Sequence, residues 1–170
     1  MFYCINYFIN SQQIIACTSI LFNKLDNDNF FIISTFEKNS IYIDSLIGEL
    51  VEWFDKFIIE YNFNSLNFAF INYNDYFCSN KLANLLITHY SNLNIHDVYY
   101  YYYSINQLFI RTYGFNSAIP IKSMKQFLQL KIDKYYVTNI EANYLLYIFI
   151  RVINDYGSRI DSLPPTTILV

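Results

Sequence analysis

The sequence has 170 residues and a mass of 20.3 kDa, which fits one domain with a hydrophobic core and is short for two. The formal charge of −3 argues against a chain coated along its whole length with positive charge for nucleic acid. The mean hydropathy of +0.18 is high, but polar residues interrupt every apolar stretch before the roughly 20 residues that a membrane-spanning helix needs.

Strand-type segments open the chain. Residues 2–8, 13–22 and 29–36 are apolar and rich in β-branched and aromatic side chains, and the polar stretches 9–13 and 23–28 separate them. This pattern predicts three antiparallel strands joined by turns.

From Ser40 onward the apolar period becomes helical. Apolar residues recur at intervals of three and four from Ile43 to Ile58, with acidic residues and Lys56 on the other side. This spacing predicts a long amphipathic helix. Residues 65–73 are mostly apolar with little alternation, which predicts a buried central strand.

The remaining chain alternates between helical and strand-like segments. Residues 79–90 predict a short helix, residues 95–104 a strand, and residues 119–131 and 139–156 two further helices. Residues 156–170 are expected to form the irregular tail of a single domain over residues 1–170. The order β-β-β-α-β-α-β-α-α resembles the ribonuclease H-like fold, an α/β architecture with a mixed five-stranded sheet and helices on both faces.

Four short stretches carry a closer resemblance. They are "CINYFINS" in the first strand, "FAFINY" in the central strand, "GFNSAIPIKS" before the penultimate helix and "IEANYLL" at the start of the last helix. In this order they resemble the I-D, A-I-E, G-x-G-x-A-x-K and D-E-A-D-A-L-A motifs of RuvC-type Holliday-junction resolvases. The third stretch keeps Gly114 and, after a two-residue insertion, Lys122, and the fourth keeps Glu141.

The resemblance implies a role for these positions. Such resolvases are dimeric endonucleases of DNA recombination and repair, in which four carboxylates hold two Mg²⁺ ions about 4 Å apart. The matching positions here are Asn6, Asn72, Ile140 and Asn143. Because these side chains lack the negative charge that binds the ions, we predict that the Mg²⁺-dependent activity is lost or weakened, and no cofactor is expected. The many Tyr, Phe, Ile and Asn residues indicate an A+T-rich genome, in which drift can replace acids by Asn.

Two acidic residues leave alternatives open. Glu141 is either a residual catalytic acid or part of a Thr138-x-x-Glu141 capping box, in which each side chain bonds the backbone N–H of the other residue. Asp75 is either a turn residue or, together with Glu141, a ligand in a shifted carboxylate set.

Basic residues concentrate in the last third of the chain. Residues 1–110 hold four lysines against ten acidic residues, whereas residues 111–170 hold seven Lys and Arg against four acidic residues. An anionic partner is therefore expected to meet the second part. The resemblance implies that Lys122, Lys125 and Arg111 contact the DNA backbone. The alternative is a solvated helix face.

Other site types find little support in the sequence. Tyr99 to Tyr103 could stack on bases, but a strand whose side chains alternate between faces explains them better. His89 and His96 lie on different predicted elements and are interpreted as structural. The three cysteines, Cys4, Cys17 and Cys78, lack metal-ligand spacing and predict buried thiols in a reducing compartment, a bacterial cytoplasm or an organellar matrix.

Three functions remain open. The first, which we favour, is a homodimeric RuvC-like protein that binds branched DNA with lost or weakened endonuclease activity. The second is an active nuclease with a shifted carboxylate set. The third is a catalytically inactive ribonuclease H-like module that acts as a protein-interaction or structural subunit, which the aromatic fraction of 21% favours. Resolvases of this family dimerise through a helix face, which here is expected to carry Leu82, Leu85 and Leu86.

Overall fold

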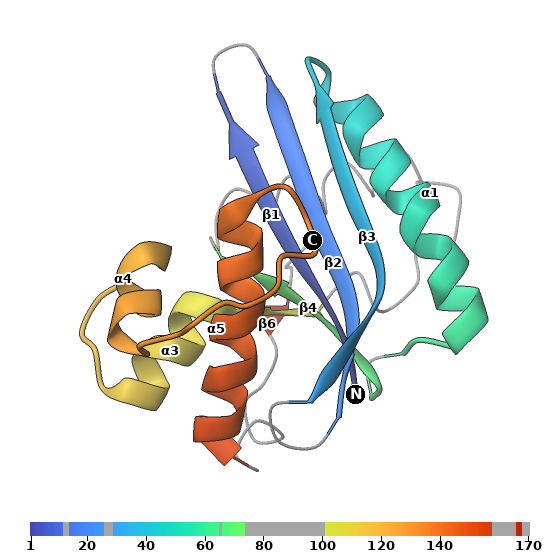
Figure 1. Cartoon of the computed structure of the whole chain (residues 1–170). Coiled ribbons are helices and arrows are strands. Elements are labelled where there is room, and N and C mark those ends of the chain that lie inside the picture. The colour runs from blue at the N-terminus through green and yellow to red at the C-terminus, as the bar shows by residue number, and fades with distance from the viewer. Residues whose placement is uncertain (12–13, 26–28, 65, 74–100, 158–165, 168–170) are drawn as a thin grey trace.

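The computed structural model describes residues 1–11, 14–25, 29–64, 66–73, 101–157 and 166–167 (Figure 1). Several predicted features lie outside these residues: the helix over 79–90 with its three leucines, Asp75, Cys78 and both histidines. The fold of the described residues follows from strand, turn and helix signals in the sequence.

Three antiparallel strands form one half of the sheet, as predicted. β1 (Phe2–Asn10) pairs with β2 (Ile15–Lys24), and β2 pairs with β3 (Phe30–Ser40). A register shift between β2 and β3 marks a β-bulge, and β3 lies at one edge of the sheet. Bulges and charged side chains hinder the pairing of an edge strand with other chains, so the bulge together with Glu37 and Lys38 protects this edge.

The predicted amphipathic helix is α1 (Ile43–Tyr61), which packs on one face of the sheet. Its buried side chains recur at the helical spacing that the sequence predicts. The Phe54 ring lies 5.0 Å from that of Phe68 and 4.9 Å from that of Phe70, measured between centroids. Aromatic contacts of this kind anchor the helix to the central strand.

Two strands that run parallel to β1 extend the sheet on its other side. β4 (Phe68–Asn72) pairs with β1, and β5 (Tyr101–Ser104) pairs with β4. The two-residue strand β6 (Thr166–Thr167) pairs with β5 in the antiparallel direction. The strand order is β3-β2-β1-β4-β5-β6. The mixed sheet of five predicted strands is confirmed, and β6 is an addition, because part of the tail predicted as irregular pairs with the edge of β5.

A helix that the sequence pattern does not predict follows β5 directly. It is α3 (Ile105–Tyr113). Its N-cap is Ser104, whose hydroxyl accepts a hydrogen bond from the Gln107 backbone N–H at 3.3 Å. Gly114 ends the helix in the left-handed conformation, with a φ of 74°. Ser104 and Gly114 are typical helix-end residues and could have indicated this helix. The tyrosine run before them favours a strand, so the sequence pattern does not predict it.

The last two helices correspond to predicted ones. α4 (Ile121–Phe127) is shorter than the predicted segment 119–131, and Gln129, just after it, has a φ of 51°. Since a left-handed residue cannot continue a helix, the chain turns there. α5 (Ile140–Tyr156) agrees closely with its predicted range. None of the helices in the described ranges is long and apolar enough to cross a membrane.

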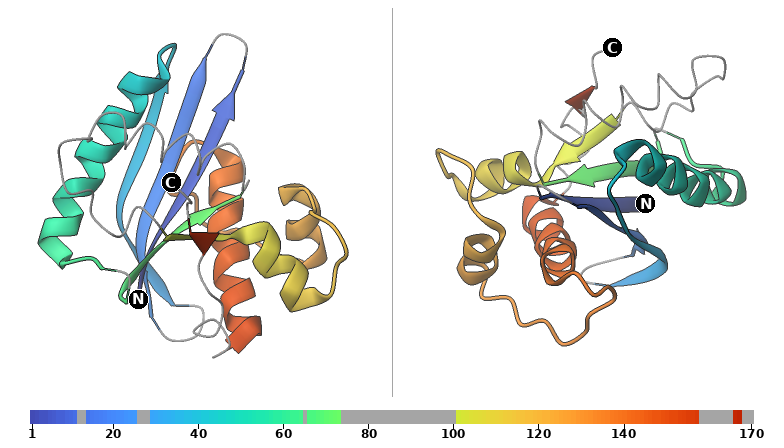
Figure 2. Two further views of the ribbon diagram at one scale, coloured as in Figure 1. Left: turned by 180° about the vertical axis from the view of Figure 1, so that it is seen from behind. Right: turned by 90° about the horizontal axis from the view of Figure 1, so that it is seen from above.

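Helices cover both faces of the sheet, as predicted: α1 packs on one face, and α3, α4 and α5 pack on the other (Figure 2). The alternation of β1 identifies the faces. Tyr3 and Ile5 belong to the core beneath α5, whereas Cys4 belongs to the core beneath α1. We call these two sides the α5 face and the α1 face.

Candidate functional site

Asn6 and Asn72 lie side by side at the centre of the sheet, on the α1 face. They are register partners in the parallel pair β1–β4, and both are buried. Asn6 Oδ1 accepts hydrogen bonds from Ser19 Oγ at 2.7 Å and from Cys4 Sγ at 3.6 Å. Asn72 shares this face with Phe70, two residues earlier in β4. α5 lies on the opposite face, so both amides point away from it.

Two atoms of this amide pair have no hydrogen-bond partner within the described part of the chain. They are Asn6 Nδ2, a donor, and Asn72 Oδ1, an acceptor. The two groups are complementary and sit on neighbouring strands. Their outer register partners, Ser19 and Ser104, are buried neutral hydroxyls, and a carboxylate buried beside them without a compensating cation is costly. The surroundings therefore suit neutral amides.

The Asn143 side chain is fully buried in α5, and its hydrogen-bonding capacity is used completely. Its Oδ1 accepts from the backbone N–H of Tyr136 at 2.7 Å and of Val137 at 3.4 Å. Its Nδ2 donates to the carbonyl oxygens of Val137 at 2.8 Å and of Asn139 at 2.7 Å. A carboxylate could accept these bonds but could not donate them. Asn143 therefore holds the segment that precedes α5.

Ile140 and Glu141 begin α5 at the surface. Ile140 is 55% exposed. The Tyr7 hydroxyl donates a hydrogen bond to the Glu141 carboxylate and so joins α5 to β1. Burial raises the pKa of Tyr73, and the nearby Glu141 carboxylate raises this pKa further. Tyr7 and Tyr73, each one residue after an asparagine, therefore lie on the side of the sheet that carries Glu141.

The predicted capping box of Thr138 and Glu141 is wrong. Asn139 is the N-cap of α5, and its Oδ1 accepts a hydrogen bond from the Ala142 backbone N–H at 2.9 Å. Thr138 instead donates to the Glu37 carboxylate of β3, through its backbone N–H at 2.7 Å and through its hydroxyl. Asn is as good an N-cap residue as Thr, so Asn139 takes the cap, and the side chains of Thr138 and Glu141 bond to the sheet.

A pocket of about 430 Å³ lies between β2, β3 and the start of α5. Its lining is largely polar and includes Thr18, Glu37, Asn39, Thr138 and Asn139. Glu37 lines this pocket, and Glu141 lies in the first turn of α5, so both carboxylates are near the N-terminus of α5, where the helix dipole favours negative charge. Both carboxylates accept hydrogen bonds from protein groups, so both serve to attach α5 to the sheet.

The described residues do not fit a two-metal centre. Among them, no group of three or more His, Cys, Asp and Glu side chains gathers closely enough to hold a metal ion. The four positions of the resemblance do not converge: Asn6 and Asn72 face α1, Ile140 is apolar and exposed, and Asn143 is bound to backbone groups. Glu141 remains as a single carboxylate, whereas two Mg²⁺ ions require several.

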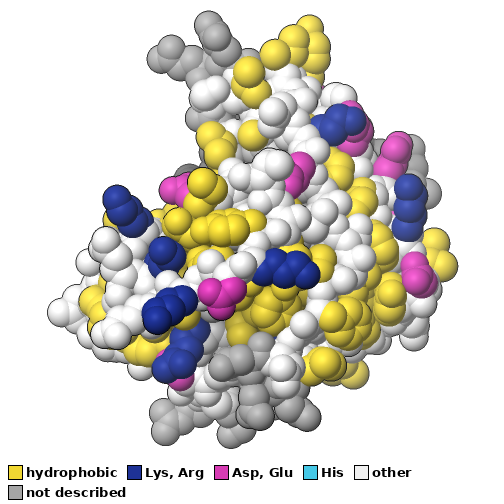
Figure 3. All heavy atoms as spheres, in the orientation of Figure 1, with side chains coloured by type: hydrophobic (Ala, Val, Ile, Leu, Met, Phe, Trp, Pro, Cys, Tyr) yellow, Lys and Arg dark blue, Asp and Glu magenta, His cyan; other side chains and the backbone are white. Residues whose placement is uncertain are grey.

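The predicted DNA-contacting residues lie on the helices of the α5 face. Lys122 and Lys125 are on α4, and Arg111 is in the last turn of α3. Aromatic rings join these two helices. Lys122 and Arg111 are exposed, whereas Lys125 Nζ lies 4.7 Å from the ring centroid of Tyr144 on α5. Figure 3 shows Lys and Arg side chains gathering over this side of the molecule.

Residues 128–139, which we call the strap, connect α4 to α5 and run across the outer side of α5 (Figures 1 and 2). Asn143 binds the strap at Tyr136 and Val137, and the Tyr147 hydroxyl donates a hydrogen bond to the Lys134 carbonyl at 3.0 Å. The strap is thus fixed at two places along α5. Sequence reasoning missed it, and the available signal was a polar residue, Asn143, at an otherwise apolar position of the helix.

Comparisons with known proteins support the fold. No protein-family model matches the sequence, and no match is found among curated proteins. The chain resembles the crystal structure of cell-death related nuclease 4 (CRN-4), with a TM-score of 0.58 and 12% sequence identity. The match covers 90% of this chain and 64% of that chain, so this chain spans less than two thirds of that nuclease. At this identity the likeness shows the fold alone: the chain shares its α/β fold with that nuclease.

Proposed function

We propose that the chain is a RuvC-like protein that binds branched DNA as a homodimer, in DNA recombination or repair, with its Mg²⁺-dependent endonuclease activity lost or weakened. The observation that supports the loss of activity is the orientation of Asn6 and Asn72. Both point away from α5, so among the described residues Glu141 is the one carboxylate of the four resemblance motifs that lies between α5 and the central strands.

Positive charge on the α5 face supports the DNA-binding part of the proposal. Lys122, Lys125 and Arg111 lie on two helices that pack together, and phosphate contacts from such side chains supply most non-specific affinity for DNA. The buried cysteine side chains of Cys4 and Cys17 fit the reducing compartment that the proposal includes.

A four-way DNA junction tests both parts of the proposal. The purified chain is mixed with a labelled junction in EDTA at low salt, and binding is followed by gel shift. Mg²⁺ or Mn²⁺ is then added, and the strands are separated to detect nicks. We expect a shifted junction with no symmetric nicking. Replacing Lys122, Lys125 and Arg111 together by Gln should weaken binding and lower the salt dependence by about 0.9 per lost phosphate contact.

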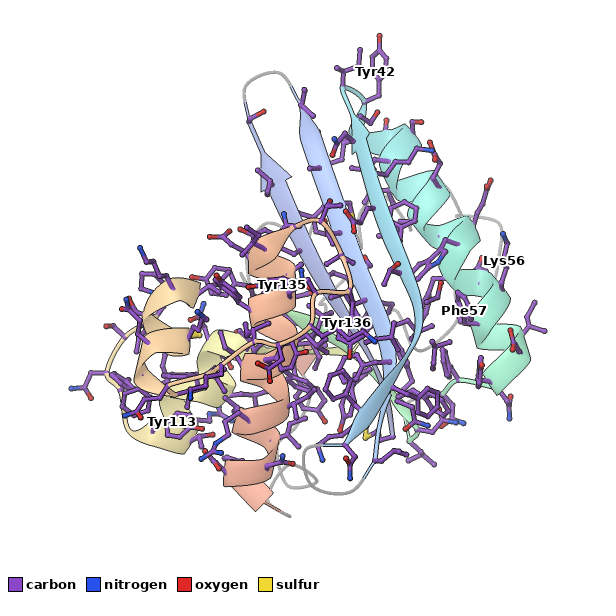
Figure 4. The ribbon with its side chains drawn as sticks, in the orientation of Figure 1. Tyr42, Lys56, Phe57, Tyr113, Tyr135 and Tyr136 are labelled. Atoms are coloured by element: carbon purple, nitrogen blue, oxygen red, sulfur yellow. The ribbon has the colours of Figure 1, made fainter. Side chains whose placement is uncertain are left out.

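Each part has its own contrary result. Junction that stays unshifted at low salt would remove the DNA-binding function. Symmetric nicks that form at a multiple-turnover rate would contradict the proposed loss of activity. They would favour an active nuclease with the shifted carboxylate set. The matched control is Lys56→Gln, because Lys56 lies on α1, on the other face of the sheet (Figure 4).

A protein-interaction module is the second candidate, because one end of the molecule exposes a group of large apolar side chains. Ile9 and Ile14 flank the β1–β2 turn, and Ile41 and Tyr42 follow β3. Ile41 and Tyr42 are 66% and 68% exposed. The test is sedimentation velocity of the chain and of the Ile41→Ser/Tyr42→Ser variant. This candidate would be favoured over the first if the wild type self-associates and binds no DNA, and if the variant does not self-associate.

A further inference from the structure

Exposed aromatic rings and lysines occur together on α4 and the strap. Residues 121–139 hold four lysines and a single acidic residue, Asp133. Tyr135 on the strap is 52% exposed, and Phe127 at the end of α4 is 49% exposed. One exposed ring is ordinary, but a surface that combines rings with a surplus of positive charge is typical of a binding site.

Contacts between side chains make this surface continuous. Desolvation raises the pKa of Tyr135, and the hydroxyl of the neighbouring Tyr144 on α5 raises this pKa further. The Tyr144 ring in turn lies 4.7 Å from Lys125 Nζ on α4. On the strap, Lys134 Nζ lies 4.9 Å from the centroid of the Tyr136 ring. Strap, α4 and α5 therefore present a single surface, which Figure 4 shows around Tyr135 and Tyr136.

The hydrogen bonds beneath the strap keep this surface in place. Asn143 binds the backbone of Tyr136 and Val137, and the Tyr147 hydroxyl binds the Lys134 carbonyl. Tyr135 lies between these anchor points. Because the segment is already ordered, a ligand that stacks on the Tyr135 ring loses little affinity to ordering it.

We propose that this surface binds unpaired nucleic-acid strands, with Tyr135 and Phe127 stacking on bases and Lys122, Lys131 and Lys134 contacting phosphates. The inference rests on the proposed function and names the part of branched DNA that this side of the molecule binds. A duplex hides the faces of its bases inside the stack, so exposed rings among lysines complement an unpaired strand better than a duplex.

Fluorescence anisotropy with labelled oligonucleotides tests the inference. The probes are an oligo-dT strand of about 16 nucleotides, an oligo-rU strand of the same length, a duplex of that length and the four-way junction. We expect the unpaired strands to bind more tightly than the duplex. Tyr135→Leu keeps an apolar side chain of similar size but removes the ring, and it should weaken binding of unpaired strands roughly tenfold. Tyr135→Phe should retain wild-type affinity.

Matched variants separate stacking from charge and from folding. Tyr42→Leu removes an exposed tyrosine at the far end of the molecule and should leave binding unchanged (Figure 4). Lys131→Gln should lower the slope of log affinity against log salt by about 0.7 for unpaired strands. Thermal melts of all variants should agree with the wild type, because these side chains are exposed.

The outcomes distinguish this inference from the proposed function. Tighter binding of dT or rU that falls in Tyr135→Leu supports the inference, and the ratio of the two probes identifies DNA or RNA as the source of the strand. Junction binding without a preference for unpaired strands, or without an effect of Tyr135→Leu, overturns the inference and leaves the proposed function standing. No binding of any probe at low salt overturns both.

Discussion

At the scale of single residues, asparagine does what an aspartate could not do in this protein. Asn143 donates two hydrogen bonds and accepts two, all with backbone groups of the strap and the start of α5. Asn6 is buried and accepts hydrogen bonds from Ser19 and Cys4. An abundance of Asn in the sequence does not by itself reveal such roles, because only the surroundings distinguish a structural amide from a drifted acid.

Replacing Asn143 by Asp should destabilise the protein, although it restores an acid of the resolvase motif. The carboxylate would face the carbonyl oxygens of Val137 and Asn139. The Val137 carbonyl would lose the donor at 2.8 Å, and the Asn139 carbonyl would keep only the Asn143 backbone N–H at 3.4 Å. We expect the free energy of unfolding at pH 7 to fall by about 2–3 kcal/mol, measured by urea denaturation. Protonation of the new acid should reduce this deficit as the pH falls toward about 4.

The matched control for this change is Asn116→Asp. Asn116 is exposed between α3 and α4, so the same chemical change there should alter the stability by no more than about 0.5 kcal/mol. Equal stabilities of Asn143→Asp and the wild type would show that Asn143 does not hold the strap.

At the scale of elements, the start of α5 is capped by its own residue and attached to two strands by separate contacts. Asn139 caps the helix, Thr138 bonds to Glu37 of β3, and Glu141 accepts a bond from Tyr7 of β1. The sequence predicts the helix and its capped end correctly, but it assigns the cap to the wrong residue. Thr138 and Asn139 are both good caps, and only the tertiary bond to Glu37 decides between them.

The Asn139→Ala variant tests this assignment of the cap. We expect the free energy of unfolding to fall by about 1 kcal/mol, because the Ala142 N–H loses its acceptor at the end of a buried helix. Thermal or urea denaturation measures the change. Glu141→Gln keeps the length of the side chain and should be milder, since no capping box exists. If Glu141→Gln lowered the free energy of unfolding more than Asn139→Ala does, the result would favour the predicted capping box of Thr138 and Glu141.

The strap gives α5 a dependence on alkaline pH. Burial, with Tyr136 beside it, raises the pKa of Tyr147 to about 12 from the ordinary value of 10.0. A raised pKa of an acid means that the folded state favours the neutral phenol. The stability that the phenol provides is therefore complete below the unfolded pKa near 10.0 and is lost as the pH rises toward about 12.

Denaturation midpoints at about pH 9 and about pH 11 measure this effect. The wild type should lose stability over this interval, and Tyr147→Phe should lose less, because phenylalanine does not titrate. At neutral pH the variant should be less stable by about 1 kcal/mol through the lost bond to the Lys134 carbonyl. Identical losses in the two proteins would contradict the role of Tyr147.

At the scale of the whole molecule, most of the described fold could be predicted from the sequence. Apolar residues recur at clear strand or helix spacings in the strands, in α1 and in α5, because each of these elements buries one face or both. α3 could not be predicted by period, since it is short and follows a tyrosine-rich strand. β6 could not be predicted either, because pairing with β5 alone makes two threonines a strand. Local sequence does not contain that partner.

The candidate site was less predictable than the fold, for a reason of geometry. A shift of one residue along a strand turns every side chain to the other face of the sheet. The resemblance identifies Asn6 and Asn72, which face α1, whereas Tyr7 and Tyr73 approach Glu141 on the α5 face. Motif spacing cannot reveal this difference, because both residues of each pair belong to the same motif.

The central claim is that the described residues on the α5 face offer too few carboxylates for two-metal hydrolysis. The most direct measurement is anomalous diffraction from crystals of the full chain soaked in Mn²⁺. We predict no pair of ions between the central strands and the start of α5, near Glu141 and Tyr7. Two well-occupied Mn²⁺ ions about 4 Å apart at that place would contradict the account.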